Sequence, residues 1–321
     1  MSSHWDEYWQ QGHLTSFGDS FKGNYSGVLS TLWNTEFAKL KPNFKVLDVA
    51  TGNGALPLLI NQFFSDQQIG GHVDGVDLAQ IATDLSTQQL NDEVTVSLIS
   101  NINGNELPFE KGQYDLVMSQ FGIEYSDLSR SIPEALRVLK TGGRFCVVTH
   151  HSRSMIINRN RDILALINDS AVDNVFSIIT ALVKRMGNMS NGDDLKRVKI
   201  DPEAERLRGE LNTEINTLAK LNEAALKDCE LLNYVATLFQ QGLFWSVDKK
   251  LTYIEFASGQ IASLKERLGE LVNAALSEQK VADILASLSG AALECIDTIC
   301  DDEGKILAWK ITLIKHSESS C

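Results

Sequence analysis

The sequence predicts an α/β protein with a doubly wound, mostly parallel sheet, a terminal antiparallel hairpin and an inserted helical segment. Three observations predict it. First, the run Val46–Ala55 passes from an apolar strand through a glycine turn into a helix. Second, strand and helix patterns alternate over residues 45–150. Third, two strand patterns flank a glycine turn near the C-terminus. Such alternation favours a parallel sheet with helices on both faces.

The elements follow in order from residue 45. Strands are expected at 45–50, 72–76, 94–100, 114–119 and 144–149, and helices at 55–64, 79–90 and 127–139, where Pro133 marks a break. Residues 293–298 and 306–314 form the hairpin around a turn at 301–304. Ligands of such sheets bind at the carboxyl ends of the strands, near the switch in strand order.

The glycine turn after the first strand is the most informative motif. Gly52 and Gly54 let the backbone approach a nucleotide-like ligand, and Pro57 falls in the first helical turn, where a missing N–H is tolerated. A purely structural strand-to-helix turn is the alternative. Pro57 also holds the third glycine position of G-x-G-x-x-G, and the chain has no G-x-x-x-x-G-K-[ST], so neither nucleotide motif is present.

Two further strand ends carry polar residues. Asp77 closes the second strand, where a carboxylate either accepts hydrogen bonds from ribose hydroxyls or caps the following helix. Asn101 and Asn103 follow the third strand, in a loop that either makes turns or reads a base edge.

The order of these segments resembles the class I S-adenosylmethionine-dependent methyltransferases, especially the small-molecule group that includes the quinone-biosynthesis methyltransferases. Four segments over residues 40–150 carry the resemblance: Val46–Gly54, Gly75–Leu78, Asn103–Val117 and Glu134–Phe145. The resemblance implies a Rossmann-like, seven-stranded fold that binds S-adenosylmethionine and releases S-adenosylhomocysteine. It assigns cofactor binding to Asp48, Ala50, Gly52, Asn53, Gly54, Asp77, Leu78, Asn103, Gly104 and Gln120.

Two residues depart from the family pattern. Ala50 stands where the family has its first glycine, which adds a methyl group in a tight turn. Asn103 stands where the family often has aspartate, and its amide oxygen still accepts a hydrogen bond from an adenine amino group. Asn101, two residues earlier, is the alternative residue for this adenine contact.

The segment before the first strand, residues 1–40, is expected to be a helical arm or lid. It is rich in aromatic residues: Trp5, Tyr8, Trp9, Phe17, Phe21, Tyr25 and Trp33. In the resembling family this segment folds over the cofactor. We therefore expect Trp9 and Tyr25 to lie near the sulfonium, which gains cation–π attraction over an aromatic face. Simple packing of the arm onto the domain is the alternative.

Residues 152–289 are expected to form a helical subdomain inserted between the two parts of the cofactor-binding domain, 41–151 and 290–317. Apolar stripes with helical spacing run over 207–239 and 251–275. If unbroken, the first would span roughly 50 Å. A cap over the acceptor pocket, a homodimer surface and purely structural packing are the three interpretations. Residues 187–194 are expected to form a mobile loop.

Methyl transfer to an oxygen or nitrogen of a small molecule requires a base near the ends of the fourth and fifth strands. His150 and His151 are the candidate bases, and Glu124 would orient the base or the acceptor. The alternative is that both histidines simply end the strand in solvent. No carboxylate cluster suggests a metal-assisted reaction.

Composition narrows the expected partners. The net charge of −13 disfavours nucleic acid, and no apolar run is long enough to span a bilayer. Five cysteines without a C-x-x-C pair and a start without a signal peptide favour the cytoplasm. Cys295 and Cys300 are expected to be sheet residues. A nicotinamide-dependent oxidoreductase and a non-catalytic helical assembly protein remain the alternatives.

Overall fold

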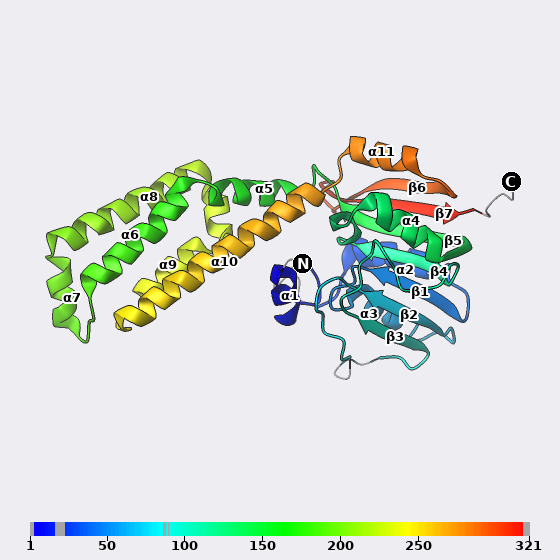
Figure 1. Ribbon diagram of the computed structural model, residues 1–321, viewed down its shortest axis with the longest axis horizontal. Coiled ribbons are helices and arrows are strands. Elements are labelled where there is room, and N and C mark those ends of the chain that lie inside the picture. Colours follow the sequence, from blue (N-terminus) through cyan, green and yellow to red (C-terminus); the bar gives the residue numbers. More distant parts are fainter. Residues whose placement is uncertain (1–2, 17–22, 86–87, 89, 317–321) are drawn as a thin grey trace. The chain divides into compact units, whose positions relative to one another are not determined.

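The computed structural model describes residues 3–16, 23–85, 88 and 90–316. Phe17 and Phe21 of the aromatic arm lie outside these residues. The chain divides into two compact units, Met1–Ile157 with Ala274–Cys321, and Asn158–Asn273. We call them the sheet unit and the helical unit (Figure 1).

The sheet unit contains one seven-stranded sheet with the order β3-β2-β1-β4-β5-β7-β6. The first five strands run parallel to their neighbours, while β7 is antiparallel to both β5 and β6. This arrangement confirms the expected doubly wound sheet with its terminal hairpin. The strands are β1 (Phe44–Val49), β2 (Gly71–Val76), β3 (Val94–Ile99), β4 (Tyr114–Gln120), β5 (Leu139–His150), β6 (Ala291–Cys300) and β7 (Ile306–Lys315).

Helices pack on both faces of this sheet because successive strand residues point to opposite sides. Val46 joins the core beneath α2 (Gly27–Phe37) and α3 (Ala55–Phe63). Its neighbour Leu47 joins the core beneath α4 (Leu128–Val138) and α11 (Glu278–Ser287). The sheet unit also holds α1 (Ser3–Gln10) and the short helix η2 (Ile123–Tyr125).

The unit boundaries differ from the expected domains. The expected insert, 152–289, is wider than the helical unit, because α11 supplies Val281 to the core on the sheet. The N-terminal arm is part of the sheet unit rather than a separate body. Cys295 and Cys300 lie in β6, as expected.

Two helix expectations in the sheet unit are wrong. The described residues of 79–90 form no helix. Instead, the amides of Gln80, Ile81 and Ala82 donate to side chains of Asp6, Ser100 and Asn53, which are remote in sequence. Helix α4 continues through Pro133 without the expected break. Pro133 lies in the middle of this helix and, because it has no N–H, costs the helix one hydrogen bond.

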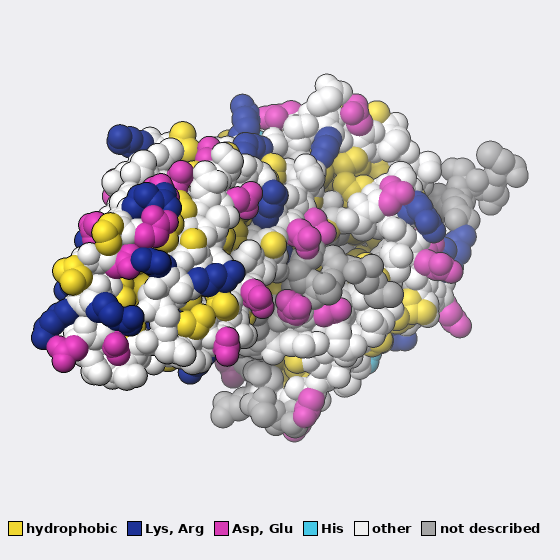
Figure 2. Space-filling view, turned by 60° about the vertical axis from the view of Figure 1, so that its left-hand side comes forward, with side chains coloured by type: hydrophobic (Ala, Val, Ile, Leu, Met, Phe, Trp, Pro, Cys, Tyr) yellow, Lys and Arg dark blue, Asp and Glu magenta, His cyan; other side chains and the backbone are white. Residues whose placement is uncertain are grey.

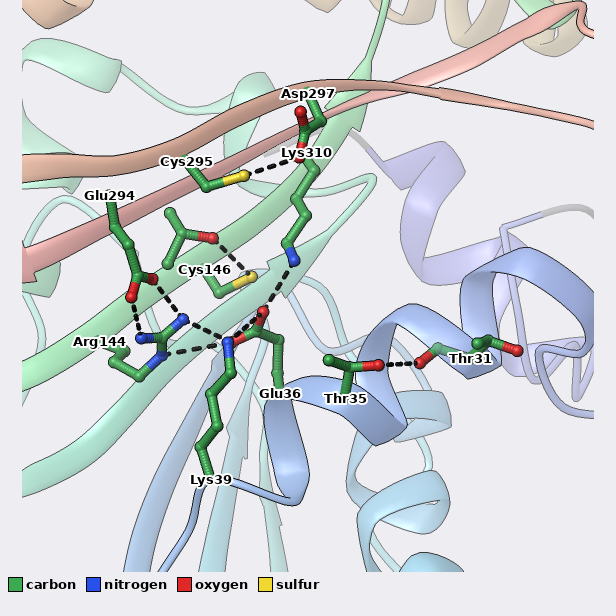
Figure 3. A network of polar contacts seen from close by, with 11 residues as sticks. Thr31, Thr35, Glu36, Lys39, Arg144, Cys146, Glu294, Cys295, Asp297 and Lys310 are labelled. Carbon is green, nitrogen blue, oxygen red and sulfur yellow. Dashed lines mark hydrogen bonds and ion pairs between the residues drawn. The ribbon is translucent and has the colours of Figure 1, made fainter.

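A buried carboxylate ties α2 to the sheet (Figure 3). Glu36 is 2 % exposed and forms ion pairs with Lys39, Arg144 and Lys310. Burial alone would raise the pKa of Glu36. Hydrogen bonds from Lys310 and Lys39, together with the charges of Lys310 and Arg144, outweigh burial and lower that pKa to about 2. The carboxylate is therefore ionised and holds α2 against β5 and β7.

The helical unit has its own apolar core. The expected long helix over 207–239 is broken, because Asn222 has non-helical angles and Glu230 adopts a left-handed φ of 64°. The expected loop 187–194 becomes helical from Gly192. The helices are α5 (Met155–Ile167), which begins in the sheet unit, α6 (Ser170–Met186), α7 (Gly192–Lys199), α8 (Pro202–Asp228), α9 (Leu231–Phe239) and α10 (Val247–Ala274).

No single helix among the described residues is long and apolar enough to cross a bilayer. The bent pair Met155–Ile167 and Ser170–Met186 meets the requirement jointly, by length and composition alone.

Candidate cofactor and active site

The loop after β1 is a sharp left-handed turn. Ala50, Gly52 and Gly54 have φ angles of 59°, 55° and 85°. Glycine adopts this region without steric cost, whereas Ala50 is strained. The hydroxyl of Thr51 donates to Asp48 Oδ2 at 2.6 Å and so closes the loop onto the end of β1.

A second buried carboxylate joins this loop to the end of β2. Asp77 Oδ2 accepts from the Gly52 amide at 2.8 Å, and Oδ1 accepts from the Ala79 amide at 2.9 Å. Burial and the nearby charge of Asp77 raise the pKa of Asp48 to about 8, and burial also raises the pKa of Asp77. Two carboxyl groups thus lie buried at the ends of the adjacent strands β1 and β2.

Helix α1 covers the glycine loop. Asn53 Nδ2 donates to the backbone oxygens of Trp9 and His13 at 2.9 and 2.7 Å. The Trp9 ring lies so close to Gly52 that a Cβ there would be 2.5 Å from it. Trp9, which we expect near the sulfonium, thus packs its ring against the glycine loop. Tyr25 lies deeper, in the core under α2, where burial raises its pKa and its hydroxyl interacts with Gln120.

Three buried polar atoms lie at or just after the carboxyl ends of β1 and β4. They are Asp48 Oδ1, Gln120 Nε2 and Glu124 Oε2, and no described residue supplies any of them with a hydrogen-bond partner. Buried polar atoms in proteins nearly always have partners. Their concentration beside the glycine loop therefore fits a polar ligand such as the expected nucleoside cofactor.

The remaining predicted cofactor residues have different surroundings. Leu78 is 47 % exposed next to Asp77, where it can cover an apolar part of a ligand. Gly104 lies against β1, since a Cβ there would be 3.1 Å from Val49 Cγ1. Asn103 is exposed, and its Oδ1 accepts from the Asn105 amide at 3.0 Å. The Asn103 side chain therefore forms a turn in this loop. Turn formation was one of the two interpretations of the loop, and contact with an adenine base was the other.

His150 and Glu124 form a buried pair at the ends of β5 and β4. Glu124 Oε1 lies 2.7 Å from His150 Nδ1 and also accepts the His150 backbone amide at 2.9 Å. Both side chains are at most 5 % exposed. A carboxylate at Nδ1 places the imidazole proton there and leaves Nε2 as a proton acceptor.

His151 has a structural setting instead. Its ring stacks on Trp309 at 4.3 Å, and its Nδ1 accepts the Arg153 amide at 3.0 Å. Burial lowers the pKa of His151, which agrees with a neutral ring. The structure thus separates the two candidate bases: His150 has a carboxylate at hydrogen-bond distance, whereas the nearest carboxylate oxygen of Glu278 is 4.0 Å from His151 Nε2.

Aromatic residues to which the sequence assigned no role surround His150. Phe121 packs 4.5 Å from the His150 ring, and Tyr125 meets that ring edge-on at 6.2 Å. Trp5 of α1 in turn packs edge-on against Tyr125. Phe121 has a φ of 54°, a conformation that sequence alone does not reveal in a phenylalanine. Helix α1 therefore contacts both the glycine loop and the surroundings of His150.

Comparison with known proteins shows what this region is similar to. Residues 29–162 match the ubiE/COQ5 methyltransferase family. The ubiquinone/menaquinone biosynthesis C-methyltransferase UbiE of Rickettsia prowazekii is 32 % identical over 129 residues, which cover 36 % of this chain and 49 % of that protein. The UbiE protein of Shewanella halifaxensis is 30 % identical over 116 residues, 35 % of this chain and 45 % of that protein. The chain spans about half the length of the curated relatives it matches.

Solved structures are similar at lower identity. Geranyl diphosphate C-methyltransferase from Streptomyces coelicolor is 21 % identical, with 38 % of this chain and 44 % of that chain covered and a TM-score of 0.32. A SAM-dependent methyltransferase from Methanosarcina mazei is 15 % identical, with 92 % and 100 % covered and a TM-score of 0.44. The family match confirms, for residues 29–162, the predicted class I methyltransferase domain and S-adenosylmethionine as the cofactor of that class.

Proposed function

We propose that this protein transfers the methyl group of S-adenosylmethionine to an oxygen or nitrogen atom of a small-molecule acceptor, with His150 as the base. One observation carries the proposal. Polar atoms of Asp48, Gln120 and Glu124 are buried without partners beside the glycine loop and the His150–Glu124 pair. A cofactor and an acceptor that meet at this place would satisfy them.

Different residues of the chain bind different parts of the cofactor. S-adenosylmethionine supplies an activated methyl group on a sulfonium. Asp77 holds the ribose hydroxyls and Leu78 covers the base. The missing side chain at Gly52 makes room for the Trp9 ring against the loop, rather than for the ligand as the sequence predicted. Trp9 presents an aromatic face near the loop, where a sulfonium gains cation–π attraction. Asp48 and Gln120 bind the polar end of the cofactor.

Proton removal is the task of the His150–Glu124 pair. Glu124 accepts the Nδ1 proton of His150, so the ring presents Nε2 to the acceptor hydroxyl or amine. The proton moves from the acceptor to Nε2 as the acceptor attacks the methyl carbon. Phe121 and Tyr125 pack around the ring and restrict its orientation.

A carbon atom is the second candidate for the methylated position. The relatives from Rickettsia and Shewanella are named C-methyltransferases. The same base serves an acceptor whose carbon becomes nucleophilic when an attached hydroxyl loses its proton. Mass spectrometry of the product with a labelled methyl group, followed by NMR assignment of the labelled atom, distinguishes carbon from oxygen or nitrogen.

Calorimetric titration with S-adenosylmethionine and with S-adenosylhomocysteine tests the cofactor. We expect binding to the wild type and a loss of at least about tenfold in affinity for Asp77→Ala, since a charged hydrogen bond is removed. Asp115→Ala is the matched control, because Asp115 lies at the opposite end of the sheet and pairs with Lys140. Absence of binding at millimolar ligand would exclude the proposal. Fluorescence titration with reduced nicotinamide cofactor tests the oxidoreductase alternative.

A further inference from the structure

One stripe of α10 faces away from the core of the helical unit. The opposite face of this helix supplies Ile254, Ile261 and Leu268 to that core. Residues three or four apart lie on the same side of a helix. On that basis the outer stripe consists of Lys249, Thr252, Phe256, Gly259, Ser263 and Glu266, of which Ser263 is half-buried and the others are exposed.

The middle of the outer stripe holds a large apolar side chain beside an open notch. Phe256 is 53 % exposed and rests against Tyr234 and Tyr253 at ring distances of 6.3 and 6.1 Å. Gly259 lies one turn further on, and nothing is found within 4 Å of the position its Cβ would occupy. Glycine destabilises a helix interior relative to alanine. A ring and a notch of this kind, side by side, are suited to interlock with a second ring and notch.

The outer stripe is complementary to itself. A two-fold axis midway between Ala257 and Ser258 would pair two antiparallel copies of α10 so that Phe256 of each faces Gly259 of the other. The same axis brings Thr252 opposite Ser263 and Lys249 opposite Glu266, so the charges at the two ends are opposite in sign. Symmetric dimers use one patch in this reciprocal way. We propose that the outer stripe of α10 is a homodimer surface and that its partner is a second copy of this chain.

The expected dimer is weak and depends on protein concentration. One pair of helices buries less than the roughly 1,200 Å² typical of stable complexes, so we expect dissociation in the micromolar range. Figure 2 shows Lys and Arg interspersed with Asp and Glu on the face it presents. Mixed signs of this kind limit repulsion between two copies of an acidic chain.

Sedimentation velocity of the full chain over a range of concentrations tests the surface. Gly259→Leu fills the notch without a clash in the monomer and is expected to abolish the dimer. Gly209→Leu is the matched control, since Gly209 is also exposed, lies inside α8 and has nothing within 4 Å of its Cβ position. The control should keep the wild-type monomer–dimer equilibrium. Circular dichroism of both variants confirms that they remain folded.

A charge exchange tests the predicted register. Lys249→Glu and Glu266→Lys should each weaken the dimer at least tenfold, and the double variant should restore it. A wild-type chain that stays monomeric up to about 500 µM, far above the dissociation constants of specific complexes, would overturn the proposal. It would also be overturned by a dimer that Gly259→Leu leaves intact, or by a monomer whose Phe256 binds lipid vesicles instead.

Discussion

A Cβ atom on Gly122 would lie 2.5 Å from the Cβ of Ala50 and 2.9 Å from the Ala50 carbonyl oxygen. Ala50 adopts a left-handed φ of 59°. The loops after β1 and β4 therefore touch at the site, and the absence of a side chain at 122 makes room for the methyl group at 50.

We expect Gly122→Ala to lower the free energy of unfolding of the sheet unit by about 1–3 kcal/mol, because the new methyl group overpacks this contact. Ala50→Gly in the same chain should recover part of the loss, since it removes the methyl contact but not the carbonyl contact. Ala50→Gly alone should be neutral or stabilising, because it relieves the left-handed strain. Urea denaturation of the wild type, the two single variants and the double variant measures the coupling between positions 50 and 122.

Gly209→Ala is the control for the general effect of a glycine-to-alanine change. Gly209 lies inside α8 with open space at its Cβ position, so alanine there should raise stability by up to about 1 kcal/mol. If Gly122→Ala costs the same free energy with alanine and with glycine at position 50, the two loops are not coupled.

His150→Asn should reduce turnover by about a hundredfold to ten-thousandfold, because it removes a proton acceptor from the site. Its affinity for S-adenosylhomocysteine should be almost unchanged. Glu124→Gln retains the shape of the side chain and an oxygen that accepts the Nδ1 proton, but removes the negative charge that stabilises a protonated ring, so we expect lower turnover with an altered pH profile. Turnover and calorimetry with the identified acceptor measure both effects.

His151→Asn is the matched control for the base. His151 contacts Trp309 and the Arg153 amide, so its loss should reduce stability more than turnover. A larger loss of turnover in His151→Asn than in His150→Asn would show that His150 is not the base.

The strands of the sheet were predictable because each is a short apolar run between turn residues. The site was predictable in part, since Gly52, Gly54 and Asp77 follow strand ends directly. The sequence offered Glu124 as a residue that orients the base, but it did not decide which histidine Glu124 pairs with, because that pairing joins residues 26 apart through the sheet. The helix expected at 79–90 failed for the same reason: side chains from remote segments hold its amides, and no local pattern records them.

Asp48 should make the stability of the sheet unit depend on pH. Burial raises the pKa of Asp48 from 3.8 to about 8, so the folded state binds a proton more tightly than the unfolded state does. The free energy of unfolding therefore falls as pH rises between about 4 and 8. Asp48→Asn should flatten this slope and gain a few kcal/mol near pH 8 relative to the wild type, while the two proteins converge in acid.

Denaturation at several pH values measures this difference. The amide oxygen of the substituted side chain can still accept the Thr51 hydroxyl, so the loop should keep its shape. If the pH dependence of the wild type persists in Asp48→Asn, a group other than Asp48 causes it. Asp77 is the first such group to test, because burial raises its pKa as well.

Lys250 should destabilise the helical unit at neutral pH. The residue is 1 % exposed, and its Nζ has no hydrogen-bond partner among the described residues. Burial lowers the pKa of Lys250, so the unfolded state binds the proton more tightly. The free energy of unfolding should therefore rise with pH through the interval that ends at the ordinary lysine value of about 10.5.

Lys250→Met replaces the buried amine by an apolar side chain of similar length, so we expect a gain of about 1 kcal/mol or more near pH 7 that shrinks above about pH 10. Lys265→Met, on an exposed position of the same helix, is the control and should change stability little at either pH. Urea denaturation followed by far-ultraviolet circular dichroism reports on the helical unit. Equal responses of the two variants at both pH values would show that the amine of Lys250 reaches water in solution.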